Sequence, residues 1–285
     1  MEQWINVSWV QWGPLQQGEP HHRPRVFSFG CCRDRLKWIG PETHEEVQRD
    51  FEELFGARVV ADGSMYMGAN PDYLKKVTSS SLAARHIHID NIDDVPIAGD
   101  EVFDTLCPGN RQRYVAYDEI QMATSKYGDA FLADLDHWPN TRSTHGNEFP
   151  CQLKHGCVWS WQLQRAAVGL EHLAAQGLHV LDGMHSRYHS RMQPYFESLG
   201  ESAIKELSGN GMCISALAAW VVYCFSNVVR VEGPKFLEEH ALATAAASTT
   251  RVDGSQPAAA SPDCPDQFAV AGDAGDDQDD KKPGA

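Results

Sequence analysis

An uncharged apolar run limits the folds open to this chain more than any other sequence feature. The run extends over residues 212–229, MCISALAAWVVYCFSNVV, and it contains no charged side chain. Its length is at the short end of the roughly 17–25 residues that cross a bilayer as a helix. Ser215, Ser226 and Asn227 add polar groups that a lipid-facing segment disfavours. We therefore predict a helix buried in a protein core, and no membrane partner.

Composition indicates a globular protein with an acidic tail. The 285 residues are 42% hydrophobic and 22% charged, which excludes a wholly disordered chain and fits one large domain or two small ones. The net charge is −15, of which residues 231–285, with 11 acidic and 4 basic side chains, carry −7. An acidic body gives no support to non-specific nucleic-acid binding. The tail is poor in large apolar residues from residue 241 onward and is predicted to be disordered.

Local patterns predict alternating strands and helices. Strands are expected at residues 25–30 and 85–92, with a turn and a further possible strand in residues 105–120. Helices are expected at residues 41–56 and 162–176, the second closed by Gly177, and a mixed, partly helical stretch at residues 194–207. Residues 208–211 (SGNG) are expected to form a turn before the apolar helix.

Three segments resemble the last motifs of the cytosine-5 DNA methyltransferases. Residues 18–27 (GEPHHRPRVF) resemble the eighth motif, Gly-x-Pro-Gln-x-Arg-x-Arg-Val, with His21 in place of the glutamine. Residues 165–171 (RAAVGLE) and 176–177 resemble the ninth, in which Arg165, Glu171, Gln176 and Gly177 keep the family spacing. Residues 207–212 (LSGNGM) resemble the tenth, a Gly-Asn turn that opens the last helix beside the methyl donor.

The resemblance implies an α/β fold, the C-terminal part of a Rossmann-like S-adenosylmethionine-dependent methyltransferase with an inserted target-recognition region. Residues 1–30 would hold the eighth motif, and residues 31–145 the recognition region. Residues 146–230 would return to the methyltransferase fold, and residues 231–285 would be the acidic tail. Lys75, Lys76, Arg111 and Arg113 are the phosphate-contact candidates of the recognition region.

The resemblance also assigns roles to individual residues. Arg25 would reach the flipped-out base or steady the catalytic glutamate, and Arg23 would support it, since a guanidinium forks onto carbonyl or carboxylate oxygens. A surface arginine on a strand edge is the plain alternative. Asn210, Gly211 and Met212 would line half of a site for S-adenosylmethionine, unless Asn210 is simply a helix N-cap.

Arg165 and Glu171 stand six residues apart, a spacing that does not share one helix face. We therefore expect them to brace the recognition region without meeting each other.

The remaining catalytic parts of the family do not occur at the expected places. Only 17 residues precede Gly18, too few for the glycine-rich cofactor loop, the Pro-Cys-Gln nucleophile loop and the Glu-Asn-Val segment, and Glu-Asn-Val occurs nowhere. Residues 150–152 spell Pro-Cys-Gln, but they follow the recognition region. We expect Pro150 to be structural there and Cys151 not to be the nucleophile.

The sequence therefore predicts a fragment or degenerate copy of a DNA (cytosine-5)-methyltransferase, inactive alone. DNA would be bound only after a partner chain supplied the front motifs. A non-catalytic DNA- or protein-binding module is the alternative. The sparse cysteines and the lack of a signal peptide indicate an intracellular protein, in the nucleus or the cytoplasm.

Two histidine patterns complete the candidate list. His86, His88 and Asp90 alternate in a way that zinc ligands can share, but a strand with Ile87 and Ile89 inward gives the same pattern without metal. His185 and His189, with Asp182, would pair on a helix but have no clear third ligand from another element. We predict no metal site.

Overall fold

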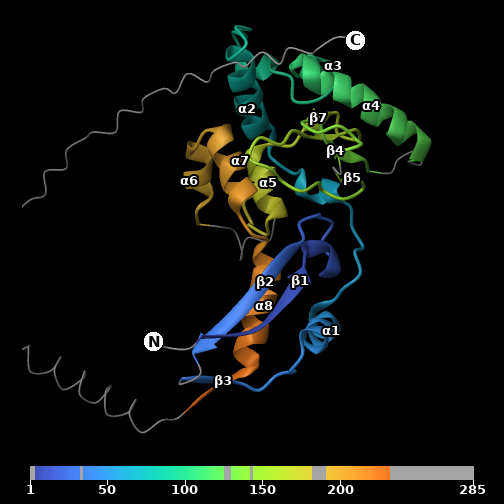
Figure 1. Cartoon of the computed structure of the whole chain (residues 1–285). Helices are drawn as coiled ribbons and strands as arrows, with labels where there is room; N and C mark the ends of the chain where they lie inside the picture. The colour runs from blue at the N-terminus through green and yellow to red at the C-terminus, as the bar shows by residue number, and fades with distance from the viewer. Residues whose placement is uncertain (1–3, 33–34, 125–129, 142–143, 182–190, 232–285) are drawn as a thin grey trace, which may run out of the picture. The chain divides into compact units, whose positions relative to one another are not determined.

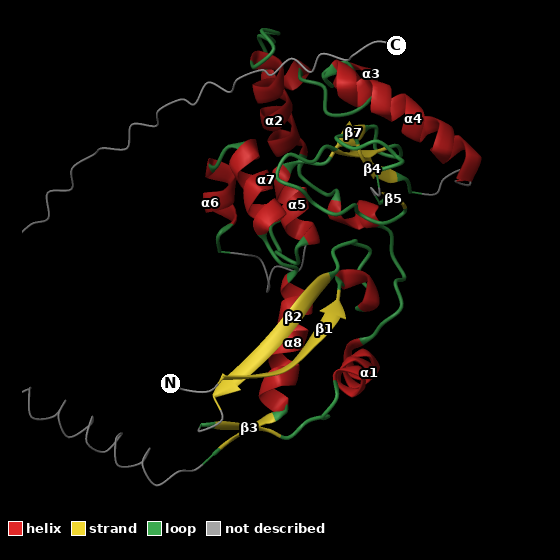
Figure 2. Cartoon of the chain, viewed as in Figure 1, coloured by secondary structure: helices red, strands yellow, loops and turns green. Residues whose placement is uncertain are grey.

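The computed structural model describes residues 4–32, 35–124, 130–141, 144–181 and 191–231, and gives the side chains from residue 9 onward (Figure 1). The predicted acidic tail and the group formed by Asp182, His185 and His189 lie outside the described residues. Figure 2 shows a mixture of helices and strands, which confirms the mixed fold class.

A long antiparallel hairpin begins the chain. Strand β1 (Trp4–Trp12) pairs with β2 (Arg25–Cys32), and the register shifts between Asn6 and Ser8. The connection between the strands contains a short 3-10 helix, η1 (Pro14–Gln16). Apolar side chains on one face of the hairpin, Val10, Trp12 and Phe27, are buried, as alternation in a half-covered strand requires.

Helices α1 (His44–Phe55) and α8 (Ile214–Ser226) cover this face. The Thr43 side chain caps α1, as the expected helix at residues 41–56 requires. Phe51 of α1 lies against Trp220 and Tyr223 of α8, with ring centroids 5.7 and 5.2 Å away. Strand β3 (Leu36–Trp38) pairs with β8 (Val228–Arg230) and joins the segments that flank the two helices.

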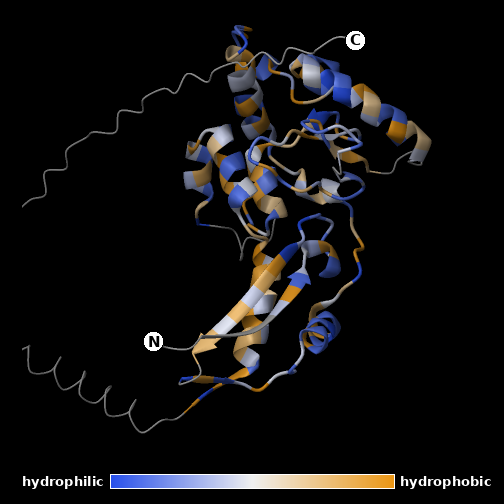
Figure 3. Cartoon of the chain, in the orientation of Figure 1, coloured by the Kyte–Doolittle hydropathy of each residue, from blue (hydrophilic) through white to orange (hydrophobic). Residues whose placement is uncertain are grey.

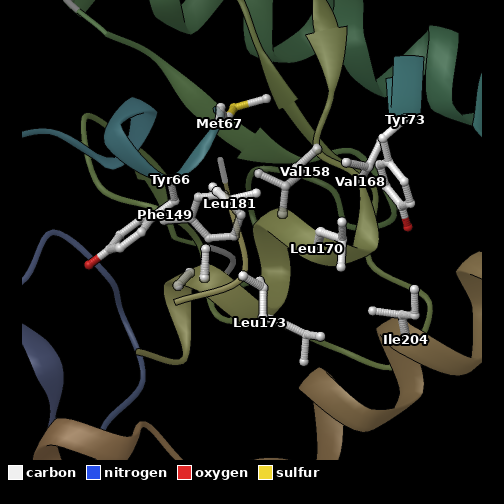
Figure 4. Packing of buried hydrophobic residues seen from close by; sticks show 14 of the residues in the cluster. Tyr66, Met67, Tyr73, Phe149, Val158, Val168, Leu170, Leu173, Leu181 and Ile204 are labelled. Atoms are coloured by element: carbon white, nitrogen blue, oxygen red, sulfur yellow. The ribbon is translucent and has the colours of Figure 1, made fainter. Parts of the chain in front are cut away.

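A second core brings together parts of the predicted recognition region and of the ninth motif. It is formed by η2 (Gly63–Tyr66), α2 (Pro71–Ala83), α5 (Gly169–Ala175) and α7 (Glu201–Asn210), with α6 (Gln193–Ser198) beside them. Figure 4 shows Leu170 and Leu173 of α5 among these side chains. Helices α5 and α7 approach closely at Gly169, where a Cβ atom would lie 2.7 Å from Ile204.

A third core surrounds a small sheet. The strand order is β5 (His145–Gly146), β4 (Leu132–Asp134), β6 (Val158–Ser160) and β7 (Arg165–Ala166). Helices α3 (Asp100–Phe103) and α4 (Pro108–Thr124) pack against it, following η3 (Ile92–Asp94). Tyr114 of α4 stacks on Trp161 with ring centroids 4.9 Å apart.

The sheet pairing is antiparallel in each ladder that the described residues form, and parallel pairing is limited to isolated bridges such as His21 with Phe149. Helix α1, placed by prediction in the recognition region, packs on the hairpin, and β4 of that region pairs with β6.

Four predictions of local structure were wrong. The turn expected at residues 208–211 is the end of helix α7, which runs to Asn210. Residues 85–92 do not form a strand: α2 ends before them, and His86 has a positive φ of 61°. The predicted turn and strand in residues 105–120 is helix α4, which begins at Pro108, since a proline is tolerated in the first helical turn. The helix expected from residue 162 begins only at Gly169, because residues 165–166 pair with β6.

The apolar run forms a helix, as predicted, and this helix is buried in a core on one face only. Helix α8 ends at Ser226, three residues before the end of the run. Its other face exposes a row of apolar side chains, and Figure 3 shows the helix largely in the hydrophobic colour. These side chains are Ile214, Leu217, Val221, Val222 and Phe225. Residues 201–226 are long and apolar enough to cross a membrane, although a core helix passes the same test.

Candidate functional site

Arg23 connects the eighth motif-like segment to the tenth and to residues 150–152. Its side chain is only 2% exposed. Its guanidinium donates to the carbonyl oxygens of Gly209 and Gly211 at 2.8 and 2.6 Å and to that of Gln152 at 3.0 Å. The glycine carbonyls lie at the end of α7, where a cation also complements the helix dipole. Arg23 therefore holds backbone together and does not project toward a ligand.

Burial lowers the pKa of the Arg23 guanidinium, and the nearby positive charge of Arg25 lowers it further. No carboxylate is among the groups that shift this pKa. The three carbonyl dipoles thus compensate the buried positive charge of Arg23. Loss of any of these hydrogen bonds would leave part of the guanidinium without an acceptor.

Gln152 and Gln176 form the second connection of this junction. The Gln176 side-chain amide donates to the Gln152 side-chain oxygen and, at 3.2 Å, to the carbonyl of Ser208 in α7. Gln152 donates in turn to the carbonyl of His172 at 2.8 Å. The backbone amide of Ile214 donates to the Gln176 carbonyl at 2.9 Å, which ties the start of α8 to the end of α5.

Gly177 follows with a φ of +84°, the left-handed conformation in which glycine ends a helix without strain. The expectation that Gly177 closes the helix before it is confirmed. The predicted Gln176 and Gly177 therefore both belong to the contact between the ninth and tenth motif-like segments.

Arg165 and Glu171 form a buried, two-pronged ion pair, so the prediction that they do not meet was wrong. The two guanidinium nitrogens donate to the two carboxylate oxygens at 2.8 and 2.7 Å. The spacing argument failed because Arg165 lies in β7 and the helix begins after it, so the turn folds one side chain onto the other. Neither side chain is more than 8% exposed.

The same pair braces a segment of the predicted recognition region, as expected. Arg165 also donates to the carbonyl of Met67 at 2.9 Å, and Glu171 accepts from the backbone amide of Ala69 at 3.0 Å. Glu171 further accepts from the amide of Val168 at the start of α5. Both terminal guanidinium nitrogens and both carboxylate oxygens are used inside the fold, which gives the pair a structural role.

Arg25 is placed differently from Arg23. It lies at the first position of β2, is half-buried, and donates to the carbonyl of its neighbour Pro24 at 2.9 Å. Among the described residues it forms no ion pair. Of the two predicted arginines, Arg25 is thus the one whose guanidinium remains accessible to a ligand or to another chain.

Asn210, Gly211 and Met212 do not open the last helix as predicted. Asn210 is the last residue of α7, Gly211 follows it, and Cys213 is the N-cap of α8. The side chains of Asn210 and Met212 are exposed, and the Gly211 carbonyl is occupied by Arg23. None of the three lines either of the two hollows described among these residues. They do not by themselves form a cradle that fits S-adenosylmethionine.

Cys151 is half-buried, and its backbone amide donates to the Thr144 hydroxyl at 3.3 Å. In the part of the chain that the structure describes, its sulfur has no hydrogen bond to a base. Its neighbour Gln152 is 1% exposed and is the residue held by Arg23. The segment thus has a structural role at the junction.

Two buried histidines beside this junction were missed by sequence analysis. His21 and His172 are both 0% exposed, and Phe149 lies within 6.2 and 5.5 Å of their rings, between centroids. Burial lowers the pKa of His21 to about 3, helped by the charge of Arg23, and burial also lowers the pKa of His172. Both imidazoles are therefore neutral. Only the replacement of the family glutamine by His21 pointed to this position.

The predicted phosphate-contact residues are engaged within the fold. Lys75 pairs with Asp93 at 3.0 Å, and Lys76 donates to the carbonyl of Glu197 at the same distance. Arg113 donates to the carbonyl of Leu135 and to Asn110. Arg111 lies 3.9 Å from Asp104 and keeps a 42% exposed side chain. These contacts compete with any phosphate, so the four residues do not form a free basic surface.

The described residues contain no group of three or more His, Cys, Asp or Glu side chains placed to hold a metal ion. His88 lies 3.5 Å from Asp90, and both side chains are almost fully exposed. No family model matches the chain, and no curated protein matches it.

Proposed function

We propose that this chain is the C-terminal portion of a cytosine-5 DNA methyltransferase-like protein and is inactive alone. One observation carries the proposal: Arg23 of the eighth motif-like segment is hydrogen-bonded to Gly209 and Gly211 of the tenth. Gln176 of the ninth motif-like segment reaches Ser208 in the same turn. Segments far apart in sequence thus lie in contact, which supports the proposal. A Rossmann-like fold, completed by a partner, is part of the proposal.

The proposal assigns the missing chemistry to a partner chain. The cytosine-attacking thiolate, the glutamate and the glycine-rich cofactor loop would come from that chain, and Arg25 would meet its glutamate or the flipped base. The residues that hold S-adenosylmethionine would also come from that chain, since Asn210, Gly211 and Met212 form no cradle for it. The exposed apolar face of α8 fits a fold that another segment completes, because such surfaces rarely stay in contact with water.

The test is methyl transfer from tritiated S-adenosylmethionine to DNA. The chain alone should transfer none. A mixture with a second polypeptide that carries a Phe-x-Gly-x-Gly loop, a Pro-Cys-Gln loop and a Glu-Asn-Val segment should methylate cytosine, and Arg25→Ala should remove that activity. The proposal is contradicted if the chain alone transfers methyl groups, or if the mixture remains equally active with Arg25→Ala.

A non-catalytic protein-binding module is the second candidate. The body carries −8, and the predicted phosphate contacts are occupied by Asp93, the Glu197 carbonyl and Asp104, which favours a protein partner over DNA. A DNA mobility shift that weakens with salt and with charge removal at Lys75 and Lys76 would instead support DNA binding.

A further inference from the structure

A cavity lies between α2, α4, β7 and α7, and residues 165–168 of the ninth motif-like segment line part of it. Its volume is about 270 Å³. Apolar side chains line one part of it, among them Leu74, Val77, Val102 and Val168. Polar and charged side chains, among them Asn110, Glu201 and Lys205, line the rest. Apolar walls combined with placed polar groups are the usual form of a small-molecule site.

One face of α2 changes from apolar to polar along this cavity. Leu74 and Val77 come first, and Thr78, Ser81 and Arg85 follow at helical spacing. Among the described residues, the side chains of Thr78, Ser81 and Arg85 have no hydrogen bond or ion pair with the protein. Arg85 and Ser81 are exposed and stand at the rim, whereas Leu74 is buried. The α2 side of the cavity is therefore apolar inside and carries the Arg85 guanidinium at its edge.

The other charged groups of the lining are largely committed. Arg165 is neutralised by Glu171. Glu201 accepts from the backbone amide of Gly169 at 2.5 Å and from the Tyr73 hydroxyl at 3.4 Å. Lys205 has longer contacts, 3.4 Å to the Gly156 carbonyl and 3.7 Å to Glu201. With Arg85 and Lys205 positive and Glu201 negative, the lining has an excess of one positive charge.

We propose that this cavity binds a small monocarboxylate with an apolar body. The apolar body would pack on Val77 and Val168. Two N–H groups of the Arg85 guanidinium would donate to the two carboxylate oxygens, assisted by the Ser81 hydroxyl. A planar guanidinium matches a carboxylate in this two-pronged way, and an apolar wall excludes a hydrated, compact anion. The site is independent of the methyltransferase-like role.

The probe is hexanoate, compared with hexanol and hexylammonium, which keep the apolar chain and change the head group. Binding is followed by the methyl resonances of Val77 and Val168 in the full chain. Hexanoate should bind saturably and about tenfold more tightly than hexanol, the effect of one charge-assisted contact at a partly exposed site. Equal affinity for the three probes, or no saturable shift at these methyl groups, would overturn the proposal.

Two variants locate the site. Arg85→Gln, at an exposed position, should weaken hexanoate about tenfold and leave hexanol unchanged. Val77→Phe should fill the cavity and remove both, while Val115→Phe, an exposed α4 position outside the lining, should change neither. Urea unfolding confirms that each variant is folded. Unchanged hexanoate binding in folded Arg85→Gln contradicts the proposal.

Discussion

The carbonyl oxygen of Gly211 accepts a hydrogen bond of 2.6 Å from Arg23, which lies 188 residues earlier in the chain. This contact closes the end of α7 with a side chain from the β1–β2 connection. The stability of the end of α7 therefore depends on a residue so distant in sequence that local sequence patterns cannot predict the contact.

Replacement of Arg23 should destabilise the fold strongly. Arg23→Ala leaves three carbonyl oxygens without their donor in a buried site, so we expect a loss of about 3 kcal/mol in the free energy of unfolding. Arg23→Lys should reduce the free energy of unfolding less, because lysine keeps the positive charge although it cannot donate to all three carbonyls in the same geometry. Arg25→Ala is the matched control and should change stability by less than about 0.5 kcal/mol in urea titration. Similar losses at Arg23 and Arg25 would contradict the assignment.

The Arg165–Glu171 pair should show strong coupling. Removal of one partner leaves a buried charge alone, at a cost of about 3–5 kcal/mol. The double variant Arg165→Met with Glu171→Gln should lose clearly less than the sum of the single variants, since neither charge is then left unpaired. Equilibrium unfolding of the three variants measures this. Additive losses would mean that the two groups do not interact in solution.

Stability should fall on mild acidification because of His21 and His172. The folded protein holds the pKa of His21 at about 3, below its ordinary 6.5, so the unfolded chain binds the proton more readily. The contribution of each neutral histidine is full above pH 6.5 and declines below it, by about 1.4 kcal/mol per pH unit. The charged groups that act on the two rings, Arg23, Arg25 and Lys205, are cationic and offer no compensation.

The check is urea unfolding between pH 7 and pH 5. His21→Phe should reduce the slope of stability against pH by about half, leaving the part that belongs to His172. The exposed His155 provides the control, and His155→Asn should leave the slope unchanged. An unchanged slope in His21→Phe would show that His21 is not buried as the neutral form.

Replacement by alanine should affect stability differently at two glycines near the ends of α7. A Cβ atom at Gly209 would lie 2.6 Å from the backbone nitrogen of Lys154, whereas one at Gly200 meets no atom within 4 Å. Gly209→Ala must therefore move backbone and should cost more than about 1 kcal/mol. Gly200, with a φ of −70°, accepts alanine without strain, so Gly200→Ala should be neutral or slightly stabilising. Thermal unfolding compares the two.

The exposed face of α8 should control association but not folding. Val221→Gln with Phe225→Gln removes apolar surface that contacts water and should lower dye binding and self-association, with little change in unfolding free energy. Trp220→Ala, on the buried face of the same helix, should cost about 3–5 kcal/mol. Light scattering and urea titration separate the two effects. A large loss of stability in the Gln variant would show that this face is covered.

Apolar periodicity and the residues that end helices and strands predicted an element correctly where the two signals agreed. The strand at residues 25–30 and the helix at residues 41–56 are present as β2 and α1, and the apolar spacing of the helix places Val47 and Phe51 in the core. Residues 85–92 alternate like a strand, but no partner strand pairs with them among the described residues, and alternation alone does not provide hydrogen bonds. Helix α4 was missed because its Pro-Gly start resembles a turn.

For the candidate site too, part could be predicted from the sequence and part could not. The sequence by itself determined, through the resemblance of three segments to family motifs, that Arg23, Arg165, Glu171 and Gln176 were candidates. Only the tertiary structure decided that Arg23 faces inward to Gly209 and Gly211, and that Arg165 meets Glu171 across a strand-to-helix turn. The physical reason is that buried charge must find partners wherever the backbone brings them, and sequence spacing does not encode those long-range approaches.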